Sequence, residues 1–407
     1  MNVNFAKKLS MALALAASSV AFGAMSTNER VAQLEKQMQC VYMDVIYDDC
    51  GQQTMTCGAQ TAPARPMTMG DKCRCGYGWF VEFDVIYWHP KVGGTEFAYT
   101  DDSPVLQVAA NNTANPGFPV KGRVKDIDFG WDWGFKVALG YNFDHDNWDG
   151  LIKYTRLDSE GSESTRPGQN SLVVPLRGSS SITNGPNVVN VDPQPTGTFI
   201  YCASAKSEFD IDYDRLDLEM GRNFFVSPKL SMRPYVGLVA AWIDLYQNIR
   251  YSGGAPSSSN LGLDVNTVHI HDESDFKGVG PKLGFDSKWY LGHKFSVFGN
   301  ISTALVYGHF DVSHQEYYSL LEDTNEISLN GDTNRFAPNS VYELGLSYDT
   351  YLNDNKQHLS LALGFEGQYW FRVNQMLKID DFAVLKFERF SEDVSFHGVT
   401  FKIRLDF

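Results

Sequence analysis

Few residues of this 407-residue chain stand at spacings that catalysis or metal binding would require. The sequence contains no Gly-x-Ser-x-Gly, His-Glu-x-x-His or Gly-x-x-x-x-Gly-Lys segment. His269-x-His271-Asp272 could bind a metal ion from one face of a strand, but exposed loop histidines beside acids are usually solvated. We therefore expect neither an enzyme active site nor a metal site, and no cofactor.

Disulfide chemistry is the second possibility, because five of the six cysteines lie in one short window. Cys73-x-Cys75 lacks the spacing of a zinc knuckle, and no nearby Cys or His pair completes a tetrahedral set. An exported protein oxidises its thiols, so the window favours disulfides over metal. At least one cysteine must be free, bonded to the distant Cys202, or bonded to another molecule. The disulfide candidates are Cys40, Cys50, Cys57, Cys73, Cys75 and Cys202.

Charged side chains at every second position offer a third kind of chemistry, the lining of a polar lumen. Between residues 128 and 143, large apolar residues occupy the odd positions and small or charged residues the even ones. The same period returns at 342–349, 359–366 and 399–407. It is typical of strands with one polar and one apolar face. The pore-lining candidates, six acids and three bases, are Asp128, Asp132, Lys136, Glu343, Asp349, Glu366, Lys402, Arg404 and Asp406.

Six further segments alternate more weakly and bring the visible strands to ten. In one of them the apolar phase switches between Tyr213 and Leu216, which predicts a β-bulge. Most of the segments reach the roughly 9–11 residues that cross a bilayer at a tilt. The six segments are 79–88, 148–157, 209–224, 230–249, 276–289 and 295–310.

The connections between these strands alternate between short and long. Short turns of about four to six residues lie near 144, 226, 291 and 352. Their length is typical of the periplasmic turns of outer-membrane barrels. The fold class is therefore all-β: a transmembrane antiparallel β-barrel of the outer membrane with about ten clear strands. Up to about 16 strands would fit if the long stretches hide further pairs, for example around 379–388. The long stretches lie near 89–127, 158–207, 251–275, 311–340 and 372–394.

The first 78 residues precede the barrel and have a different character. Lys7 and Lys8 stand before an apolar stretch that ends in small residues, so 1–24 is expected to be a secretory signal peptide. Residues 25–78 form a periplasmic segment with two heptads of apolar seam, or a solvated helix that packs on the body, followed by the cysteine window. The predicted barrel occupies 79–407.

Charge and hydropathy argue against two classes of protein. The chain has 49 acidic and 34 basic residues, so nucleic acid is disfavoured as a partner. Beyond residue 24 no stretch approaches the roughly 18 apolar residues of a membrane-spanning helix, which excludes a helical membrane protein. The predicted lumen leans acidic, so we expect a modest preference for cations.

Several aromatic-rich segments of the predicted barrel form a recognisable set. They are WFVEFDVIYWHP (79–90), WDWGFKV (131–137), RPYVGL (233–238), GVGPKLG (278–284) and EGQYWFRVNQ (366–375). In this order they resemble the major outer membrane proteins of Legionella and of chlamydia-like bacteria, and the resemblance covers most of 79–407. It implies a β-barrel porin of the outer membrane and, for the chlamydial relatives, a cysteine-rich envelope that is cross-linked by disulfides.

These observations predict a general diffusion porin that is also a structural envelope component and is disulfide cross-linked. The expected partners are outer-membrane lipid, small hydrophilic solutes and ions, further copies in a homo-oligomer (a trimer), and disulfide-linked envelope proteins. The alternatives are a barrel-borne outer-membrane enzyme and an adhesin, which the Ser/Asn/Gly/Pro-rich segment 160–197 could serve.

The C-terminal strand is expected to be the assembly signal. It must pair with the first strand, because an unclosed edge would leave backbone groups unpaired in lipid. The resemblance adds that outer-membrane precursors generally end on an aromatic residue, here Phe407. The residues of the expected signal are Phe401, Ile403, Leu405 and Phe407.

Overall fold

The computed structural model describes most of the chain from residue 78 onward. All of its regular elements are β-strands, and no helix among the described residues is long and apolar enough to cross a membrane. The predicted signal peptide, the heptads and the five clustered cysteines lie outside the described residues. The described residues are 78–101, 121–144, 146–166, 172–177, 202, 204–252, 267–292, 294–318, 325–352, 357–381, 386–389 and 391–407.

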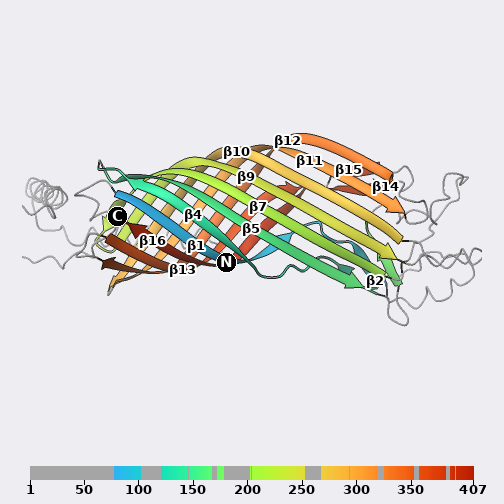
Figure 1. Ribbon diagram of the computed structural model, residues 1–407, viewed down its shortest axis with the longest axis horizontal. Coiled ribbons are helices and arrows are strands. Elements are labelled where there is room, and N and C mark those ends of the chain that lie inside the picture. The colour runs from blue at the N-terminus through green and yellow to red at the C-terminus, as the bar shows by residue number, and fades with distance from the viewer. Residues whose placement is uncertain are drawn as a thin grey trace, which may run out of the picture. The chain divides into compact units, whose positions relative to one another are not determined.

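Ten antiparallel strands form a closed ring, in the order β1-β4-β5-β7-β9-β10-β11-β12-β13-β16 (Figure 1). Each of the ten predicted strands is present, so the predicted β-barrel is confirmed. The bounds are β1 Gly78–Val92, β4 Asp132–Asn142, β5 Trp148–Thr165, β7 Ser204–Arg222, β9 Leu230–Ser252, β10 Thr267–Gly292, β11 Phe295–Tyr318, β12 Asn325–Leu352, β13 Gln357–Asn374 and β16 Glu392–Asp406.

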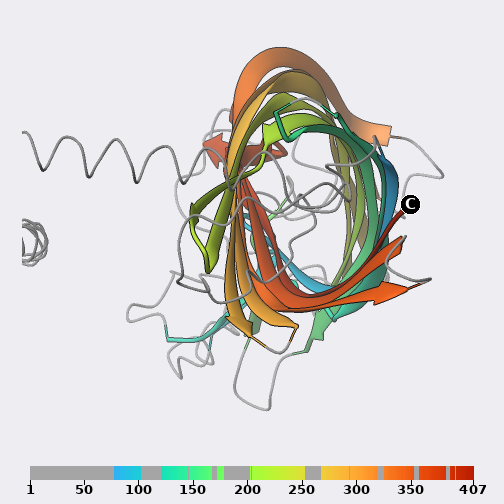
Figure 2. The same cartoon turned by 90° about the vertical axis from the view of Figure 1, so that its left-hand side faces the viewer.

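The first and last strands close the ring, as the sequence predicts. Their register runs from Phe80 opposite Asp406 to Val92 opposite Val394, and the Phe407 amide donates to the Trp79 carbonyl at 3.0 Å. Figure 2 shows the strands as a closed ring seen from the end where the C-terminus lies. Because every strand has two partners, the barrel has no open edge that would leave backbone groups unpaired in lipid.

Six short strands lie outside the ring. β2 (Ala98–Asp101), β3 (Val124–Lys125) and β6 (Leu172–Pro175) form a three-stranded sheet, and β8 (Phe224–Ser227) pairs only with β9. The hairpin expected near 379–388 is present as β14 (Leu377–Asp381) and β15 (Lys386–Arg389). It forms a sheet of its own, so it does not widen the barrel.

The outer surface of the ring changes from apolar to polar along the strands. On β1 the outward residues from Trp79 to Tyr87 are apolar or aromatic, and they span nine residues. On β10 the outward residues from Val279 to Leu291 are apolar except for Ser287, but those from His269 to Lys277 are polar or charged. The apolar band matches the length that crosses a bilayer. The polar part is an extension of the barrel beyond the membrane, at the end opposite the C-terminus (Figure 1).

This extension corrects two predictions. Much of 158–207, 251–275 and 311–340, predicted as loops, is strand. Strand pairing continues there because the two-residue alternation persists after the lipid-facing apolar pattern ends. The predicted β-bulge in β7 is absent, because the register with both neighbours is uninterrupted between Tyr213 and Leu216. The apolar phase switches because β7 leaves the membrane, and its apolar side chains then face inward.

Candidate functional site: the barrel interior

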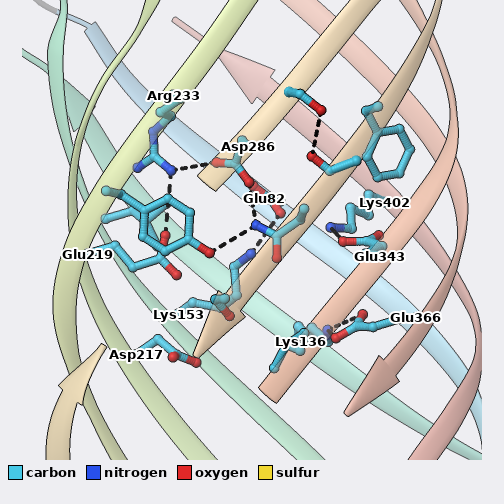
Figure 3. A pocket seen from close by; sticks show the side chains of 18 of the residues that line it. Glu82, Lys136, Lys153, Asp217, Glu219, Arg233, Asp286, Glu343, Glu366 and Lys402 are labelled. Carbon is cyan, nitrogen blue, oxygen red and sulfur yellow. Dashed lines mark hydrogen bonds and ion pairs between the residues drawn. The ribbon is translucent and has the colours of Figure 1, made fainter. Parts of the chain in front are cut away.

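The interior of the membrane-spanning half holds a polar cavity of about 260 Å³. Inward positions of β1, β4, β5, β7, β9, β10, β12, β13 and β16 contribute charged side chains to its wall (Figure 3). All of these side chains point inward because the two-residue alternation puts Gly, Ser and charged residues on one face of each strand. The charged residues that line it are Glu82, Lys136, Lys153, Arg215, Asp217, Glu219, Arg233, Lys282, Asp286, Lys288, Glu343, Glu366, Lys402 and Arg404.

Ion pairs between strands that are not neighbours tie one side of this wall together. Lys136 Nζ lies 2.5 Å from Glu366 Oε2, and both side chains are almost fully buried. Lys402 Nζ lies 2.6 Å from Glu343 Oε2. The Lys136–Glu366 pair spans β4 to β13, across β1 and β16, so it braces the ring at the point where its ends meet.

The opposite side of the wall has a second set of ion pairs. Lys282 Nζ contacts Asp217 at 2.8 Å and Glu219 at 2.6 Å. Arg215 binds Asp217 through Nε and Nη2, both at 2.8 Å, and its Nη1 donates to Asn339 Oδ1 at 2.9 Å. The contact with Asn339 crosses the interior from β7 to β12. Opposite charges are thus interleaved around the lumen. The cavity wall holds eight basic and six acidic side chains, so the acidic lean predicted from the sequence is absent from this cavity.

Asp84 is an exception in this network. It lies on the inward face of β1, opposite Lys136 on β4 and Lys402 on β16, and it is fully buried. Neither of its carboxylate oxygens has a hydrogen-bond partner among the described residues, because the two lysines bind Glu366 and Glu343 instead. A buried polar group without a partner is costly, so Asp84 is a weak point of the wall.

Apolar side chains fill the interior above this polar layer. The fully buried residues include Trp88, Phe209, Tyr213, Phe276 and Trp370, whose strands come from all sides of the ring. Trp88 faces inward on β1. The rings contact each other directly, with centroids 4.6 Å apart for Phe276 and Phe310 and 6.3 Å apart for Phe276 and Trp370. The outer half of the barrel therefore has a packed core in place of an open lumen.

One buried arginine links the three-stranded sheet to this filled interior. Arg177, just after β6, donates to the carbonyl of Glu96 at 3.2 Å and also to that of Gly94. On the barrel wall it reaches Gln247 Oε1 at 3.0 Å and Asp272 Oδ2 at 3.5 Å. Because a guanidinium makes several directed hydrogen bonds at once, Arg177 holds the segment around β2 against β9 and β10.

A histidine between two carboxylates continues this cluster. His314 binds Asp272 through Nδ1 and Glu316 through Nε2, the latter at 2.9 Å, and all three side chains are buried. Burial alone lowers the pKa of His314, but the two carboxylates outweigh it and raise the pKa to about 9. The cluster lies inside the extension and is shielded from solvent, so it has the character of a structural ion-pair network.

The outer surface of the extension carries a row of six aspartates on six consecutive strands. Each lies directly opposite the next, so like charges face each other at every step, which is unfavourable. Asp275, in the middle of the row, has its pKa raised to about 6, first by burial and then by the charge of Asp244. In order from β5 to β12 the row is Asp158, Asp212, Asp244, Asp275, Asp311 and Asp332.

Replacing Asp275 with asparagine is expected to stabilise the extension at neutral pH. A carboxyl whose native pKa is about 6 destabilises the fold once it ionises, so the cost is absent below about pH 4 and complete above about pH 7. The gain should be on the order of 1 kcal/mol at neutral pH and vanish at low pH. Hydrogen exchange of β10 amides at several pH values measures it. Asp126→Asn, on the exposed segment before β4, is the control, and equal gains in both variants would contradict the prediction.

The structure brings eight of the nine pore-lining candidates to the interior. Asp132 accepts a hydrogen bond from Ser159, and His358 lies between Asp349 and Asp406 at 3.5 and 3.1 Å. Asp128 is the exception, because it is exposed and precedes β4. Whether the eight line a conducting pore stays a prediction. The eight are Asp132, Lys136, Glu343, Asp349, Glu366, Lys402, Arg404 and Asp406.

Other predicted residues are dispersed. His269 and His271 face outward on β10, whereas Asp272 faces inward, so the three do not converge on a metal. Cys202 is a buried thiol in the described part of the chain, beside the Val173 carbonyl, and Cys40, Cys50, Cys57, Cys73 and Cys75 lie outside that part. Phe401 and Phe407 face outward, so lipid surrounds them.

Sequence reasoning missed three features of the site. Arg215, Asp217 and Glu219 were hidden by the assumed bulge, although an uninterrupted period of two through β7 would have placed them inward. Arg177 carries no signal in its own segment, because its partners come from three distant parts of the chain, around Gly94, Gln247 and Asp272. The aspartate row could be found only with the strand register.

A closed ring of amphipathic strands, apolar outside over a membrane's thickness and polar within, defines an outer-membrane β-barrel protein. The family model described as the Legionella pneumophila major outer membrane protein precursor matches residues 75–407. The chain belongs to this family, as its sequence segments suggest, and it is an outer membrane protein.

Comparison with solved structures returns other outer-membrane proteins at low similarity. The outer membrane protease OmpT from Escherichia coli aligns over 81% of this chain and 96% of its own, with 10% identity and a TM-score of 0.34. A FadL homologue from Pseudomonas aeruginosa covers 81% and 90%, with 8% identity and a TM-score of 0.23. The toluene transporter TodX from Pseudomonas putida covers 81% and 89%, with 10% identity and a TM-score of 0.22. No curated protein matches the chain.

Proposed function

We propose that this protein is a structural component of the outer membrane whose barrel is closed at rest, and that it conducts only small ions. The observation that carries the proposal is the apolar filling of the outer half of the interior. A solute such as a sugar would have to displace the packed rings of Trp88, Phe276 and Trp370 in order to pass. Close-packed interiors do not yield to such a solute without a change of conformation.

The general diffusion porin remains the second candidate. The charged cavity in the membrane-spanning half favours it, because water and ions are stable there. For this role the apolar layer above the cavity would have to open. The segment around β2, which Arg177 fixes to β9 and β10, is the part whose release would begin such an opening.

Planar-bilayer conductance separates the two candidates. The wild-type barrel is expected to give small, infrequent conductance steps, and proteoliposomes that contain it should not swell in sugar solution. Arg177→Met should increase both the conductance and its frequency, because it removes the donor of the four hydrogen bonds that join the inner segment to β9 and β10. Arg123→Met, at an exposed position, is the matched control. Large steps and sugar uptake by the wild type would support the general porin and overturn the closed barrel.

The proposal also includes oligomerisation and disulfide links, but it does not include catalysis. A homo-oligomer, as a trimer, and disulfide links to other envelope proteins stay part of it, on the evidence of the heptads and the cysteine window in the sequence. We do not propose an enzyme. Asp272, His314 and Glu316 are the group that most resembles catalytic machinery, but burial denies them a substrate.

A further inference from the structure

Three basic side chains gather on the outer surface at the seam where the barrel closes. His89 and Lys91 face outward on β1, and His397 faces outward on β16. His89 lies directly opposite His397 in the register, with ring centroids 5.2 Å apart, and Lys91 lies opposite Ser395. We call these three residues the seam cluster.

Acidic partners for the seam cluster are missing from the described part of the chain. No carboxylate of a described residue lies within ion-pair distance of Lys91, His89 or His397. Asp393, four residues before His397 on β16, accepts hydrogen bonds from the Tyr369 hydroxyl and the Arg372 amide instead. Basic groups opposite one another on a sheet repel when charged, so the cluster is better satisfied with an anion between them.

The seam cluster lies at the height of lipid headgroups. The Trp131 ring contacts both histidines, with centroids 5.6 Å from His89 and 6.1 Å from His397, and it stacks on Tyr87 at 5.4 Å. Tyr87 ends the apolar band of β1. Exposed Trp and Tyr residues mark the boundary between the hydrocarbon and the headgroups. The cluster stands just outside this boundary, on the side away from the C-terminus, and therefore at the outer leaflet.

The rest of the rim has the opposite charge. The aspartate row occupies the outer surface from β5 to β12, whereas the seam cluster occupies β16 and β1. An anionic headgroup would be repelled along most of the circumference and attracted at the seam. Charge complementarity thus selects one sector of the barrel.

We propose that the seam cluster binds the phosphate group of an outer-leaflet lipid. His89 Nδ1 donates to the Gly130 carbonyl at 2.9 Å, because a carbonyl only accepts, so the ring presents Nε2 for binding. In a neutral His89, Nε2 carries no proton and cannot donate to a phosphate oxygen. Nε2 can therefore donate to a phosphate oxygen only when the His89 ring is protonated, and the Lys91 ammonium group supplies a further donor. The lipid chains then lie along the apolar band below Trp131.

The test compares the stability of the full-length protein in two kinds of vesicle. Phosphatidylcholine vesicles provide the reference, and vesicles that also contain phosphatidic acid provide a phosphate monoester. The temperature at which the folded barrel unfolds, seen as its change in gel mobility on heating, should be higher with phosphatidic acid. The rise should be larger at about pH 6 than at about pH 8, because only a protonated imidazole donates from both ring nitrogens. The triple variant His89→Gln, Lys91→Gln, His397→Gln should lose the rise and keep its stability in phosphatidylcholine alone.

A matched variant tests whether the effect belongs to this sector. Lys206→Gln, His269→Gln, His309→Gln removes one lysine and two histidines from the acidic side of the rim, and it should keep the full rise. An equal loss in both triple variants would show only general charge attraction and overturn the proposal, as would an unchanged rise in the seam variant. A rise of the same size from inorganic phosphate in phosphatidylcholine vesicles would overturn the assignment to a lipid.

Discussion

Truncation after Gly398, which removes 399–407, is expected to abolish the barrel. This segment pairs with β1 on one side and with β13 on the other. Without it, two strands would expose unpaired amides and carbonyls to lipid, at several kcal/mol for each group. The truncated chain should show no heat-modifiable band and no protected strands in the membrane fraction.

A finer substitution separates assembly from stability at the same strand. The Phe407 amide, and not its side chain, makes the hydrogen bond to Trp79. Phe407→Ala should therefore leave the folded barrel nearly as stable as the wild type but slow its insertion in cells. Phe401→Ala, at another outward position of β16, is the control. Equal losses of surface-exposed barrel in the two variants would remove any special role for the last residue.

Lys136→Met is expected to have the second-largest effect, a loss of about 3–5 kcal/mol in the free energy of unfolding. The substitution leaves the buried Glu366 carboxylate without its cation, although Thr400 and Gln368 still donate to it. Asp84 also loses one of the two lysines that face it across the register. Urea unfolding of the barrel in lipid vesicles measures the loss.

The double variant Lys136→Met, Glu366→Gln shows how the loss arises. Removing both charges leaves no unpaired carboxylate at position 366, although Asp84 still lacks the facing lysine, so most of the stability should return. Lys125→Met, whose pair with Glu163 is half exposed, should cost less than about 1 kcal/mol. A double variant as unstable as Lys136→Met would mean that Lys136 acts through packing against the Trp88 ring, 4.7 Å from Nζ, more than through its charge.

Alternation in the sequence predicts the ten strands and, for most of them, the face that turns inward; β7 is an exception, because a bulge was predicted there and is absent. Period-two alternation is a local property of the sequence. It is strong in segments such as 128–143 and 399–407 because one face of each strand contacts lipid and the other faces a polar interior. Closure of β16 on β1 also followed from the sequence, because an open edge is too costly in lipid. Eight of the nine charged residues chosen from this pattern face the interior. Asp128 does not, because it precedes the start of β4.

The content of the interior and the pairing of its charges depend on contacts between strands that are far apart in the sequence. Beyond the membrane the outer face becomes polar, so the inward face must hold the apolar side chains, and Tyr213 and Leu216 then differ in phase without a bulge. Arg177 and Asp272 meet because loops and strands far apart in the chain converge at the mouth. The aspartate row and the seam cluster depend on the register between neighbouring strands. Strand pairing joins residues that are far apart in the sequence, so a local pattern cannot predict it. These features therefore require the closed ring with its register.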